Sequence, residues 1–414
     1  MFYIIEEEHK LENLERLMKL GAYVDVVSSN DEFHPKLTST VAVYIRLVNS
    51  HHGYIIPINH EEGLNVSKDR IYGMLNNTPK LYTKDKKELL YHFNIQGAID
   101  ISLLYSMVNY NRLEISNSNS TYNWYYTKHK HRPNVNQLIP ISKLYEKCEE
   151  TYKQVKKVID IDIPSGFEFY NNLATNVFYL LEQPGIGIYN KPFELAFTPK
   201  DPIYNIDGST VYTSYNLYNA TSRPTKTEEH RKCFKPQNDT FVEFDFDGYH
   251  LRLLCEQIGY KLSDESAHKQ LAKHYFGTED ISEEQYLEAK QINFQAIYGK
   301  IPHKHKNLKI FKLIQEFIDN MWSVYEEAGE VCNPVSGKPF TKKLGEMHPA
   351  KLMNYMMQSL ETSRNILILK DVLRFLKDKK TTVVLFTYDS LLFDFDKADG
   401  KQVLIQLEEI LNQG

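Results

Sequence analysis

The chain has 414 residues, 42% of them hydrophobic, so it is long enough to bury a core in each of two or three domains. Its net charge of −5 excludes a histone-like polyelectrolyte but not a protein that binds nucleic acid through a local basic groove. The four cysteines are scattered, without the spacing of a zinc site or of a disulfide framework.

The first twenty-one residues are acidic where a signal peptide is basic. No apolar run in the sequence approaches the ~20 residues that a membrane-spanning helix needs. Together with the scattered cysteines, these features predict a soluble protein of the reducing cytoplasm that has no membrane partner.

Residues 1–110 alternate strand-like and helix-like patterns, as in a compact α/β domain. Strands are expected in AYVDVV, TVAVYIRLVN and GYIIPI, and helices in KKELLYHF and IDISLLYSMV. Residues 110–137 are polar and poor in aliphatic side chains, which predicts a long loop or a partly disordered connector. A helix is expected at about 141–158, and the first domain is expected to end near residue 158.

The second half of the chain mixes strands and helices. A strand is expected in TFVEFDF, and helices are expected in YHLRLLCEQIG, DESAHKQLAKHYFG and EAKQINFQAIYGK, with more helices to about residue 377. The segment TTVVLFTYDSLLFDFDK has two apolar β runs interrupted at Tyr388, Asp389 and Ser390. This pattern predicts a hairpin with Asp389 at its tip.

Carboxylates on these strands indicate a metal site. In TFVEFDFDGYHLR, the alternation of side chains places Glu243, Asp245 and Asp247 on one face and apolar residues on the other. Two aspartates from neighbouring strands form a common cradle for Mg²⁺, a hard cation that takes oxygen ligands. Either aspartate taken alone is more often a turn former.

The segment 288–300 carries a stripe of one cation and several rings. Residues four apart drift only ~40° per step around a helix, so Tyr286, Lys290, Phe294 and Tyr298 share one face. Such a stripe is a poor core but suits a nucleotide, with the lysine toward phosphate and the rings against sugar and base. A tyrosine-rich helix that merely packs is the competing interpretation.

Two basic runs are compatible with nucleic-acid binding. Lys304 and Lys306 belong to a lysine-rich stretch at 300–312, and TKHKHR occupies 127–132. A solvated surface explains either run equally well.

Six segments together resemble the family A DNA polymerases, the group of bacterial polymerase I. EAKQINFQAIYG is similar to the fingers helix of that family, FDFDGYHLRLL to its first catalytic motif and TYDSLLFDF to its last. VYTSYNLYNATSRPT, SAHKQLAKHYFG and NYMMQS are similar to further palm and fingers segments, and all six occur in the family's order over about 205–396. The resemblance implies a right-hand polymerase fold with palm and fingers.

The resemblance also implies a reaction, the addition of deoxynucleotides to a primer 3′-hydroxyl with release of pyrophosphate. Asp245 and Asp389 would bind two Mg²⁺ ions, for which Mn²⁺ can substitute, with help from the backbone carbonyl of Phe246. Lys290 would act in catalysis by neutralising the triphosphate together with His268.

The other site residues are implied in the same way. Phe294 would lie beside the deoxyribose, and Tyr298 would fill the template-base position until the fingers close. Two further positions, His250 and Tyr286, would border the nucleotide. The positions implied to contact primer-template DNA are Arg223, Asn354, Gln358, Tyr388, Lys304 and Lys306. Arg223 and Gln358 match positions that contact the minor groove next to the nascent pair.

Several residues depart from the family's pattern. His250 stands where the family has a glutamate that blocks a ribose 2′-hydroxyl, which leaves discrimination against ribonucleotides uncertain. Tyr286 replaces an arginine that contacts the triphosphate, and Gln295 replaces a glycine. Tyr388 and Ser390 flank the last aspartate in place of a histidine and an acid.

The N-terminal segments AYVDVV, GYIIPINH, YTKDKKELL and AIDISLLYSMVN resemble the 3′–5′ exonuclease domain of the same family, an RNase H-like fold. That chemistry needs about four carboxylates around two metal ions. Here the first motif reads Asp25-Val26-Val27 without its glutamate, Asp85 matches the second motif, and no aspartate occurs from 101 to 159. We expect an inactive exonuclease kept as a scaffold, and therefore no proofreading.

The helical thumb is expected to be reduced or absent. Only residues 191–204 separate the two segments between which the family inserts that subdomain. Weak grip on the duplex would follow unless a processivity or replisome protein compensates.

The expected architecture is thus α/β (α+β), with an inactive exonuclease-like domain at 1–158 and a polymerase domain at 159–414. The palm is expected at about 159–257 and 340–414, and the fingers at about 258–339. A small trimmed enzyme of this kind looks like a bacteriophage protein acting in the host cytoplasm. Two alternatives remain open: a related single-subunit RNA polymerase or sugar-tolerant polymerase, and a non-catalytic DNA-binding scaffold of the replisome.

Overall fold

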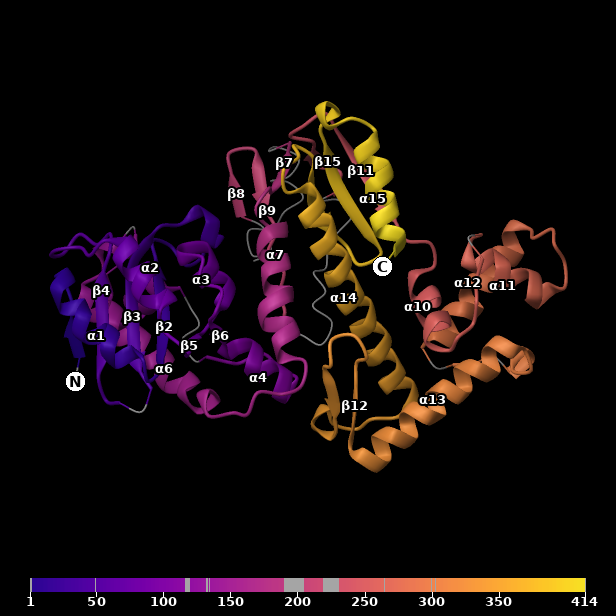
Figure 1. Cartoon of the computed structure of the whole chain (residues 1–414), viewed down its shortest axis with the longest axis horizontal. Coiled ribbons are helices and arrows are strands. Elements are labelled where there is room, and N and C mark those ends of the chain that lie inside the picture. Colours follow the sequence, from indigo (N-terminus) through magenta and orange to yellow (C-terminus); the bar gives the residue numbers. More distant parts are fainter. Residues whose placement is uncertain are drawn as a thin grey trace. The chain divides into compact units, whose positions relative to one another are not determined.

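The chain forms two compact units, each a mixture of helices and strands (Figure 1). This computed structural model describes residues 2–48, 50–115, 120–131, 133, 135–189, 205–218, 231–263, 265–298, 300–301 and 303–413. Unit 1 is Met1–Tyr218 with Glu228–Cys233, and unit 2 is Asn219–Thr227 with Phe234–Gly414. The chain's contacts therefore divide near 219–233 and not at residue 158, so the assignment of 159–218 to a palm stays a proposal.

Unit 1 is built on a six-stranded sheet with the order β1-β4-β3-β2-β5-β6. The strands are β1 Phe2–Ile4, β2 Ala22–Ser28, β3 Thr40–Leu47, β4 Gly53–Pro57, β5 Leu81–Thr83 and β6 Ile99–Asp100. Strand β3 is antiparallel to both of its neighbours, and the other pairs are parallel. The three strands expected from the sequence correspond to β2, β3 and β4.

Helices and one smaller sheet complete unit 1. The helices are η1 Glu8–Lys10, α1 Leu11–Met18, η2 Pro35–Leu37, α2 Lys68–Asn76, α3 Lys86–Phe93, α4 Ile101–Asn109, α5 Thr121–His129, η3 Asn136–Leu138, α6 Ile141–Ile159, the π-helix η4 Phe169–Ala174 and α7 Thr175–Leu181. Strands β7 Ile186–Ile188, β9 Thr210–Tyr212 and β8 Asn205–Asp207 pair antiparallel in that order.

The central strand β2 is covered on both faces, which explains its continuous apolar run. Val24 and Val26 belong to an apolar cluster that also contains side chains of α1 and α2. On the other face the ring of Tyr23 lies 5.3 Å from that of Tyr152 in α6. Asp25 is a charged residue in this otherwise uncharged strand and is only 5% exposed.

The expected structureless connector at 110–137 is partly wrong, because residues 121–129 form α5. Both carboxylate oxygens of Asp31 accept hydrogen bonds from the Thr121 backbone N–H, at 2.8 and 2.9 Å. Trp124 is 3% exposed, and its indole N–H donates to Glu150 at 2.9 Å. Polar composition indicated a loop because the partners of these side chains lie elsewhere in the chain.

Unit 2 contains a three-stranded sheet, a hairpin and a set of long helices. The strands are β10 Phe234–Lys235, β11 Thr240–Asp245, β12 Glu330–Cys332, β13 Pro339–Thr341, β14 Thr382–Phe386 and β15 Ser390–Phe395. The helices are α10 Tyr249–Gln257, α11 Ala267–Phe276, α12 Glu283–Ile297, η5 His303–His305, α13 Lys309–Ala328, η6 Lys342–Leu344, α14 Pro349–Leu376, η7 Lys397–Asp399 and α15 Gln402–Gln413. The expected C-terminal hairpin is β14–β15.

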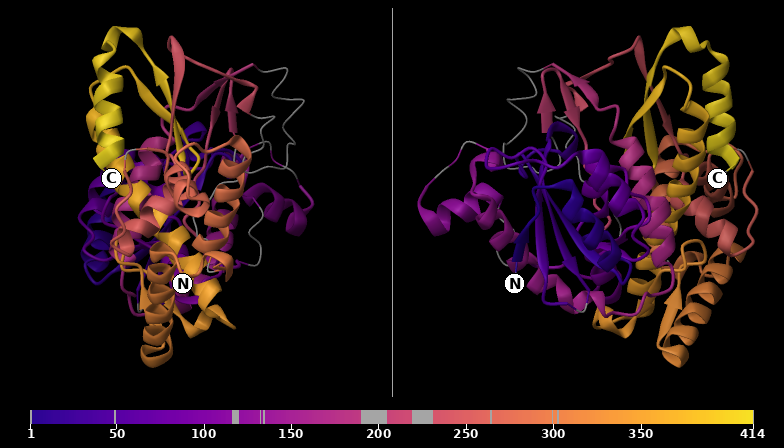
Figure 2. Two further views of the ribbon diagram at one scale, coloured as in Figure 1. Left: turned by 90° about the vertical axis from the view of Figure 1, so that its right-hand side faces the viewer. Right: turned by 60° about the vertical axis from the view of Figure 1, so that its left-hand side comes forward.

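The sheet of unit 2 has the order β11-β15-β14, with both pairs antiparallel. Helix α15 runs beside this sheet in each view of Figures 1 and 2. An apolar core joins α10, α11, α12, α13 and α14 through buried side chains such as Leu254, Leu271, Ile292, Ile314 and Met357. This core holds the five helices together, and the hydrogen bond from the Asn365 amide of α14 to the Tyr388 carbonyl links them to the β14–β15 turn.

Candidate nucleotide and metal site

The two predicted metal-binding aspartates lie at the same end of two paired strands. Asp245 is the last residue of β11, and its Cα pairs with that of Ser390, the first residue of β15. One step further, the backbone N–H of Phe246 donates to the carbonyl oxygen of Asp389 at 2.7 Å. The antiparallel ladder therefore brings Asp245 next to Asp389, although the two residues are 144 positions apart in the sequence.

The turn that carries Asp389 has a fixed backbone. Tyr388 has φ 74°, a left-handed conformation that a non-glycine residue adopts at some cost. The side-chain amide of Asn365, on α14, donates to the Tyr388 carbonyl at 2.7 Å. The Asp389 N–H donates to the Thr387 carbonyl at 3.0 Å, which closes the turn and leaves the aspartate at its tip.

The electrostatics of this strand end favour a cation. Partial burial raises the pKa of Asp245, and the neighbouring carboxylates of Asp389, Glu243 and Asp247 raise it further, while Lys290 acts in the opposite direction. Acidic groups that repel one another in this way are stabilised when a positive charge lies between them.

The donor set fits a hard divalent cation. In the described part of the chain, no three His, Cys, Asp or Glu side chains gather into a group able to hold a metal ion. The pair Asp245 and Asp389 would therefore need backbone oxygens, water and substrate phosphates to complete the coordination of Mg²⁺, which is how this ion is usually held.

Helix α12 exposes the middle of the predicted stripe, Lys290 and Phe294, whereas Tyr286 and the C-cap residue Tyr298 are half-buried. It begins with a capping box, in which the Ser282 hydroxyl accepts from the Gln285 N–H and the Gln285 side chain accepts from the Ser282 N–H. Lys290 is exposed and Phe294 is 45% exposed, whereas Ala289, Ile292, Asn293, Ala296 and Ile297 are buried. Lys290 and Phe294 thus share an exposed face of the helix, and binding of a ligand to the stripe stays a prediction.

His268 on α11 lies against the stripe of α12. Its ring is nearly parallel to that of Phe294 at a centroid distance of 6.5 Å, and perpendicular to that of Tyr286 at 6.3 Å. The buried amide of Asn293 lies 3.0 Å from His268 Nδ1. Burial lowers the pKa of His268; Asp247 acts to raise it and Lys290 to lower it, and the net shift is downward, which favours the neutral ring beside the lysine.

Asn293 is a residue that the sequence reasoning missed. Its side chain bridges His268 and Tyr275, because the Tyr275 hydroxyl donates to Asn293 Oδ1 at 2.5 Å. A polar residue among the apolar residues of the buried face was the available signal, because a buried amide needs partners.

Asp247 has a structural role at this site. It accepts hydrogen bonds from the Ala267 N–H at 2.8 Å and from the Ser266 hydroxyl at 3.2 Å, and it pairs with Arg252 at 3.2 Å. The next residue, Gly248, has φ 58°, and a Cβ there would lie 3.1 Å from the Cβ of Ala267. The segment after β11 can therefore approach the start of α11 only with glycine at 248.

His250 links α10 to α12 and α14. Its ring lies edge-on to that of Tyr298 at a centroid distance of 6.3 Å, and Tyr298 lies 6.4 Å from Phe294. His250 Nε2 is 2.9 Å from a carboxylate oxygen of Glu361, a residue of α14 that the sequence reasoning did not single out. The geometry does not meet the criteria for a hydrogen bond, so the contact is a close approach of the ring nitrogen to the carboxylate.

The predicted DNA-contacting residues are distributed over several elements of unit 2. Gln358 and Asn354 are half-buried neighbours on α14, and the Gln358 amide donates to Asn354 Oδ1 at 2.7 Å. Lys304 and Lys306 are exposed, and Lys306 Nζ lies 3.2 Å from His303 Nε2. Arg223 lies outside the described residues. The structure thus brings Gln358 and Asn354 together, while DNA contact stays a prediction for all of them.

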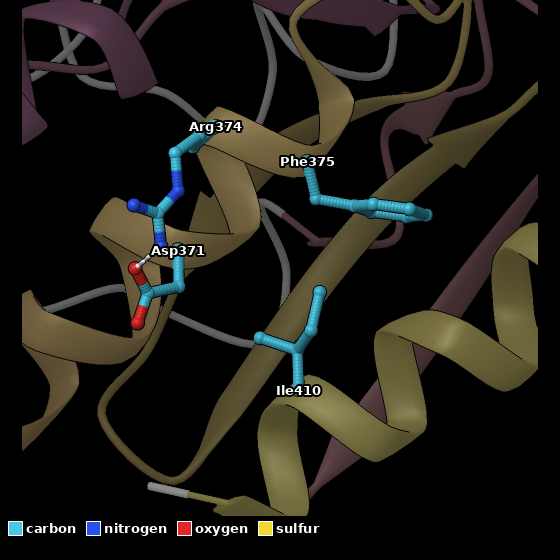
Figure 3. Close-up of a pocket in the computed structure, with 4 residues that line it drawn as sticks. All are labelled: Asp371, Arg374, Phe375 and Ile410. Atoms are coloured by element: carbon cyan, nitrogen blue, oxygen red, sulfur yellow. Dashed lines mark hydrogen bonds and ion pairs between the residues drawn. The ribbon is translucent and has the colours of Figure 1, made fainter.

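A surface hollow of about 330 Å³ also occurs in unit 2 (Figure 3). It is lined by Asp371, Arg374, Phe375 and Ile410, and Arg374 pairs with Asp371 at 2.5 Å. None of the predicted site residues lines this hollow, so it is a feature separate from the aspartates and the α12 stripe.

A second group of carboxylates, in unit 1, surrounds a lysine. Lys84 Nζ lies 3.5 Å from Asp25 and 3.9 Å from Glu88. Burial raises the pKa of Glu88 to about 8. Folding thus favours the protonated form of Glu88. The stability that this protonated carboxyl contributes is lost as the pH rises from about 4.5 to about 8.

Asp85, the match to the second exonuclease motif, is the N-cap of α3. Its side chain accepts hydrogen bonds from the N–H groups of Lys87 and Glu88.

Replacing Lys84 should destabilise unit 1. In Lys84→Met, the buried carboxylate of Asp25 would lose the ammonium group 3.5 Å away, which should lower the free energy of unfolding by ~1–3 kcal/mol. Urea unfolding followed by circular dichroism measures the change. The control is Lys10→Met, because Lys10 and its partner Glu7 are both about half exposed, and its loss should have little effect. Equal stability of Lys84→Met and Lys10→Met would show that Lys84 does not hold the carboxylates.

Comparison with known proteins gives a likeness of fold. No protein-family model matches the sequence, and no curated protein sequence matches it. The polymerase domain of Pol1 from M. smegmatis, solved in complex with a DNA primer-template and dNTP, has a similar structure, with a TM-score of 0.64 at 12% sequence identity. The match covers 100% of this chain and 95% of that one. The chain therefore has a mixed α/β fold like that of a polymerase I polymerase domain.

Membrane insertion through a helix has no support in this fold. In the part of the chain that the structure describes, none of the helices combines the length and the apolar character that crossing a bilayer requires.

Proposed function

We propose that the protein is a template-directed DNA polymerase of the family A type, which extends a primer 3′-hydroxyl with deoxynucleotides. The observation that carries the proposal is the meeting of Asp245 and Asp389 at paired strand ends, with Lys290 near enough to influence the pKa of Asp245. Acidic residues, a cation and exposed rings in one unit suit a substrate with a triphosphate end and a flat base. The likeness of fold to a polymerase domain supports the same conclusion.

Two Mg²⁺ ions would be held by Asp245 and Asp389, with the backbone carbonyl of Phe246. When bound, such ions supply Lewis-acid activation of a hydroxyl nucleophile and charge stabilisation at the leaving pyrophosphate. The protein contributes a rigid frame to this site, because the β11–β15 ladder and the Asn365 hydrogen bond fix the two strand ends before substrate arrives.

The nucleotide would lie along the exposed face of α12. Lys290 would neutralise phosphate charge, and Phe294 and Tyr298 would offer ring faces to the sugar and base. His268, held by Asn293 beside this face, would add a hydrogen-bonding group for a phosphate oxygen. The side chains of Tyr286 and His250 would border the same volume.

The primer-template would contact the same unit. Gln358 and Asn354 offer amides of the kind that hydrogen-bond base edges in the minor groove, and the remaining candidates are Arg223, Tyr388, Lys304 and Lys306. Residues 191–204, where the family inserts the thumb, lie outside the described residues. If the thumb is reduced, extension by this protein alone would have low processivity and would increase with a partner that holds the duplex.

Unit 1 is proposed to be an RNase H-like exonuclease domain without activity, which serves as a scaffold. Its mixed sheet, with the antiparallel strand β3 between β2 and β4, supports that assignment of the fold. The lysine among its carboxylates supports the loss of activity, because an ammonium group beside Asp25 and Glu88 opposes binding of a metal cation there.

Primer extension tests the polymerase proposal. A 5′-labelled primer on a template strand should be lengthened when dNTPs and Mg²⁺ are present, and EDTA should stop the reaction. Ribonucleotides on the same template distinguish a sugar-tolerant or RNA-synthesising enzyme. No extension with any nucleotide, at excess protein and with Mn²⁺ as well as Mg²⁺, would reject the proposal in favour of a non-catalytic DNA-binding role.

The absence of proofreading gives a separate prediction. A 3′-labelled single strand should keep its label during prolonged incubation with the protein and Mg²⁺ or Mn²⁺. Release of label that disappears in Asp25→Asn would show instead that unit 1 is an active nuclease. Release that persists in that variant would indicate a contaminating nuclease, which a second purification step would remove.

A further inference from the structure

Glu361 is a buried carboxylate next to the proposed nucleotide site. It is 2% exposed and lies on α14, between the half-buried Gln358 and the buried Asn365 of the same helix. A buried carboxylate is costly unless a cation or hydrogen-bond donors compensate for its lost hydration. One of its close contacts is with Nε2 of His250, 2.9 Å away.

His250 borders the proposed site. It lies in the first turn of α10, five positions after Asp245, and its ring is edge-on to that of Tyr298, the C-cap residue of α12. A nucleotide with its phosphates near Asp245 and Lys290 and its base near Tyr298 would have its sugar beside His250. This placement rests on the proposed function.

Two side chains pack against the ring of His250. Glu361 contacts Nε2, and Tyr298 packs against the ring at an interplanar angle of 86°. The ring is only 12% exposed, so little free space surrounds it. Rejection of a sugar that carries one extra hydroxyl requires such rigidity, because a misplacement of ~1 Å can cost ~10²-fold in an enzyme site.

We propose that Glu361 is a positioning residue that fixes the His250 ring as a barrier to a ribose 2′-hydroxyl. Selection for deoxynucleotides would then depend on a carboxylate of α14 that does not itself touch the nucleotide. A purely structural role for Glu361 would change stability but not the choice between the two sugars.

Discrimination measured in a double-mutant cycle tests this inference. The ratio of kcat/KM for dCTP to that for CTP should fall about tenfold in Glu361→Gln. It should fall at least as far in His250→Ala, and the double variant should resemble His250→Ala alone, because Glu361 acts through that ring. The control is Asp371→Asn, an exposed carboxylate on the same helix, which should keep the wild-type ratio.

Two additions keep the outcome unambiguous. If Glu361→Gln does not fold by circular dichroism, Glu361→Asp, which keeps the charge on a shorter side chain, takes its place in the cycle. Equilibrium titration with dCTP and CTP measures the same preference without turnover, so a failure of primer extension would reject the polymerase proposal and leave this measurement intact. An unchanged preference in both readouts, or additive effects in the double variant, would overturn the role of Glu361.

Discussion

Asp389→Asn should reduce primer extension by about a thousandfold or more while leaving the protein folded. The change removes a negative charge from the pair that would hold the metal ions, and metal-ion catalysis is worth several kcal/mol in such reactions. The change in the free energy of unfolding should be small, because the turn is held by backbone hydrogen bonds that asparagine keeps. These are the Phe246 N–H bond to the Asp389 carbonyl and the Asp389 N–H bond to the Thr387 carbonyl.

The matched control is Asp239→Asn. Asp239 stands at the opposite end of the β11–β15 ladder, where its N–H donates to the Phe395 carbonyl and its carboxylate accepts from the Lys397 N–H. The same chemical change there should leave extension close to that of the wild type. Steady-state kinetics on a primed template, with thermal unfolding of each variant, separates a catalytic loss from a folding loss. Near-wild-type extension by Asp389→Asn would remove the two-aspartate mechanism.

Asp389→Asn should also change the pKa of Asp245. Because Asp389 raises the pKa of Asp245, its neutralisation should lower that pKa toward the ordinary value. In Asp389→Asn, Asp245 should therefore stay ionised to a lower pH than in the wild type. The acid limb of the pH–rate profile for the residual activity should move to lower pH. A pH–rate profile of the residual activity provides the check.

Local periodicity allowed the sequence to predict much of the site. The alternation in TFVEFDFD specified which residues of β11 face solvent, and the spacing by four in α12 specified which residues share the stripe with Lys290. Both patterns depend only on the geometry of a strand or a helix. The meeting of Asp245 with Asp389 needed the further inference that the two strands pair, which the resemblance to a family supplied and the ladder shows.

Other features depended on partners that no local pattern reveals. Helix α5 forms in a polar segment because Asp31 caps it and Glu150 receives its tryptophan N–H. Lys84 and Glu361 are likewise defined by what they meet, a pair of carboxylates in one case and an imidazole in the other. In the sequence each is an ordinary charged residue of a helix or loop, and only the tertiary structure gives it a role.

The position of the domain boundary likewise depends on contacts that no local pattern reveals. The long helix at 141–159 was expected to end the first domain, yet the segment that follows it continues unit 1. Glu182 at the end of α7 is fully buried, and it pairs with Lys87 of α3 at 2.6 Å and lies near His34. These contacts fix α7 to the N-terminal sheet domain, although composition gives no sign of them.

Lys290→Met should lower kcat/KM for dNTPs by about a hundredfold, the second-largest effect expected here. Removal of a preorganised positive group that faces developing negative charge typically costs 10²–10³ in rate. The fold should survive, because the Lys290 side chain is exposed and the buried face of α12 is unchanged. Lys290→Arg keeps the charge and should recover part of the activity, although its planar head reaches the phosphates differently.

The same variant should change the pH dependence in a defined direction. Lys290 lowers the pKa of Asp245 against the effects of burial and of Asp389, so its removal should raise that pKa. If ionised Asp245 is required, the acid limb of the pH–rate profile should move to higher pH in Lys290→Met but not in Lys290→Arg. Lys269→Met on α11, an exposed lysine 3.9 Å from Glu265, is the control and should change neither the rate nor the profile. A hundredfold loss without any movement of the acid limb would mean that Lys290 acts on the triphosphate alone and is not coupled to Asp245 in the working enzyme.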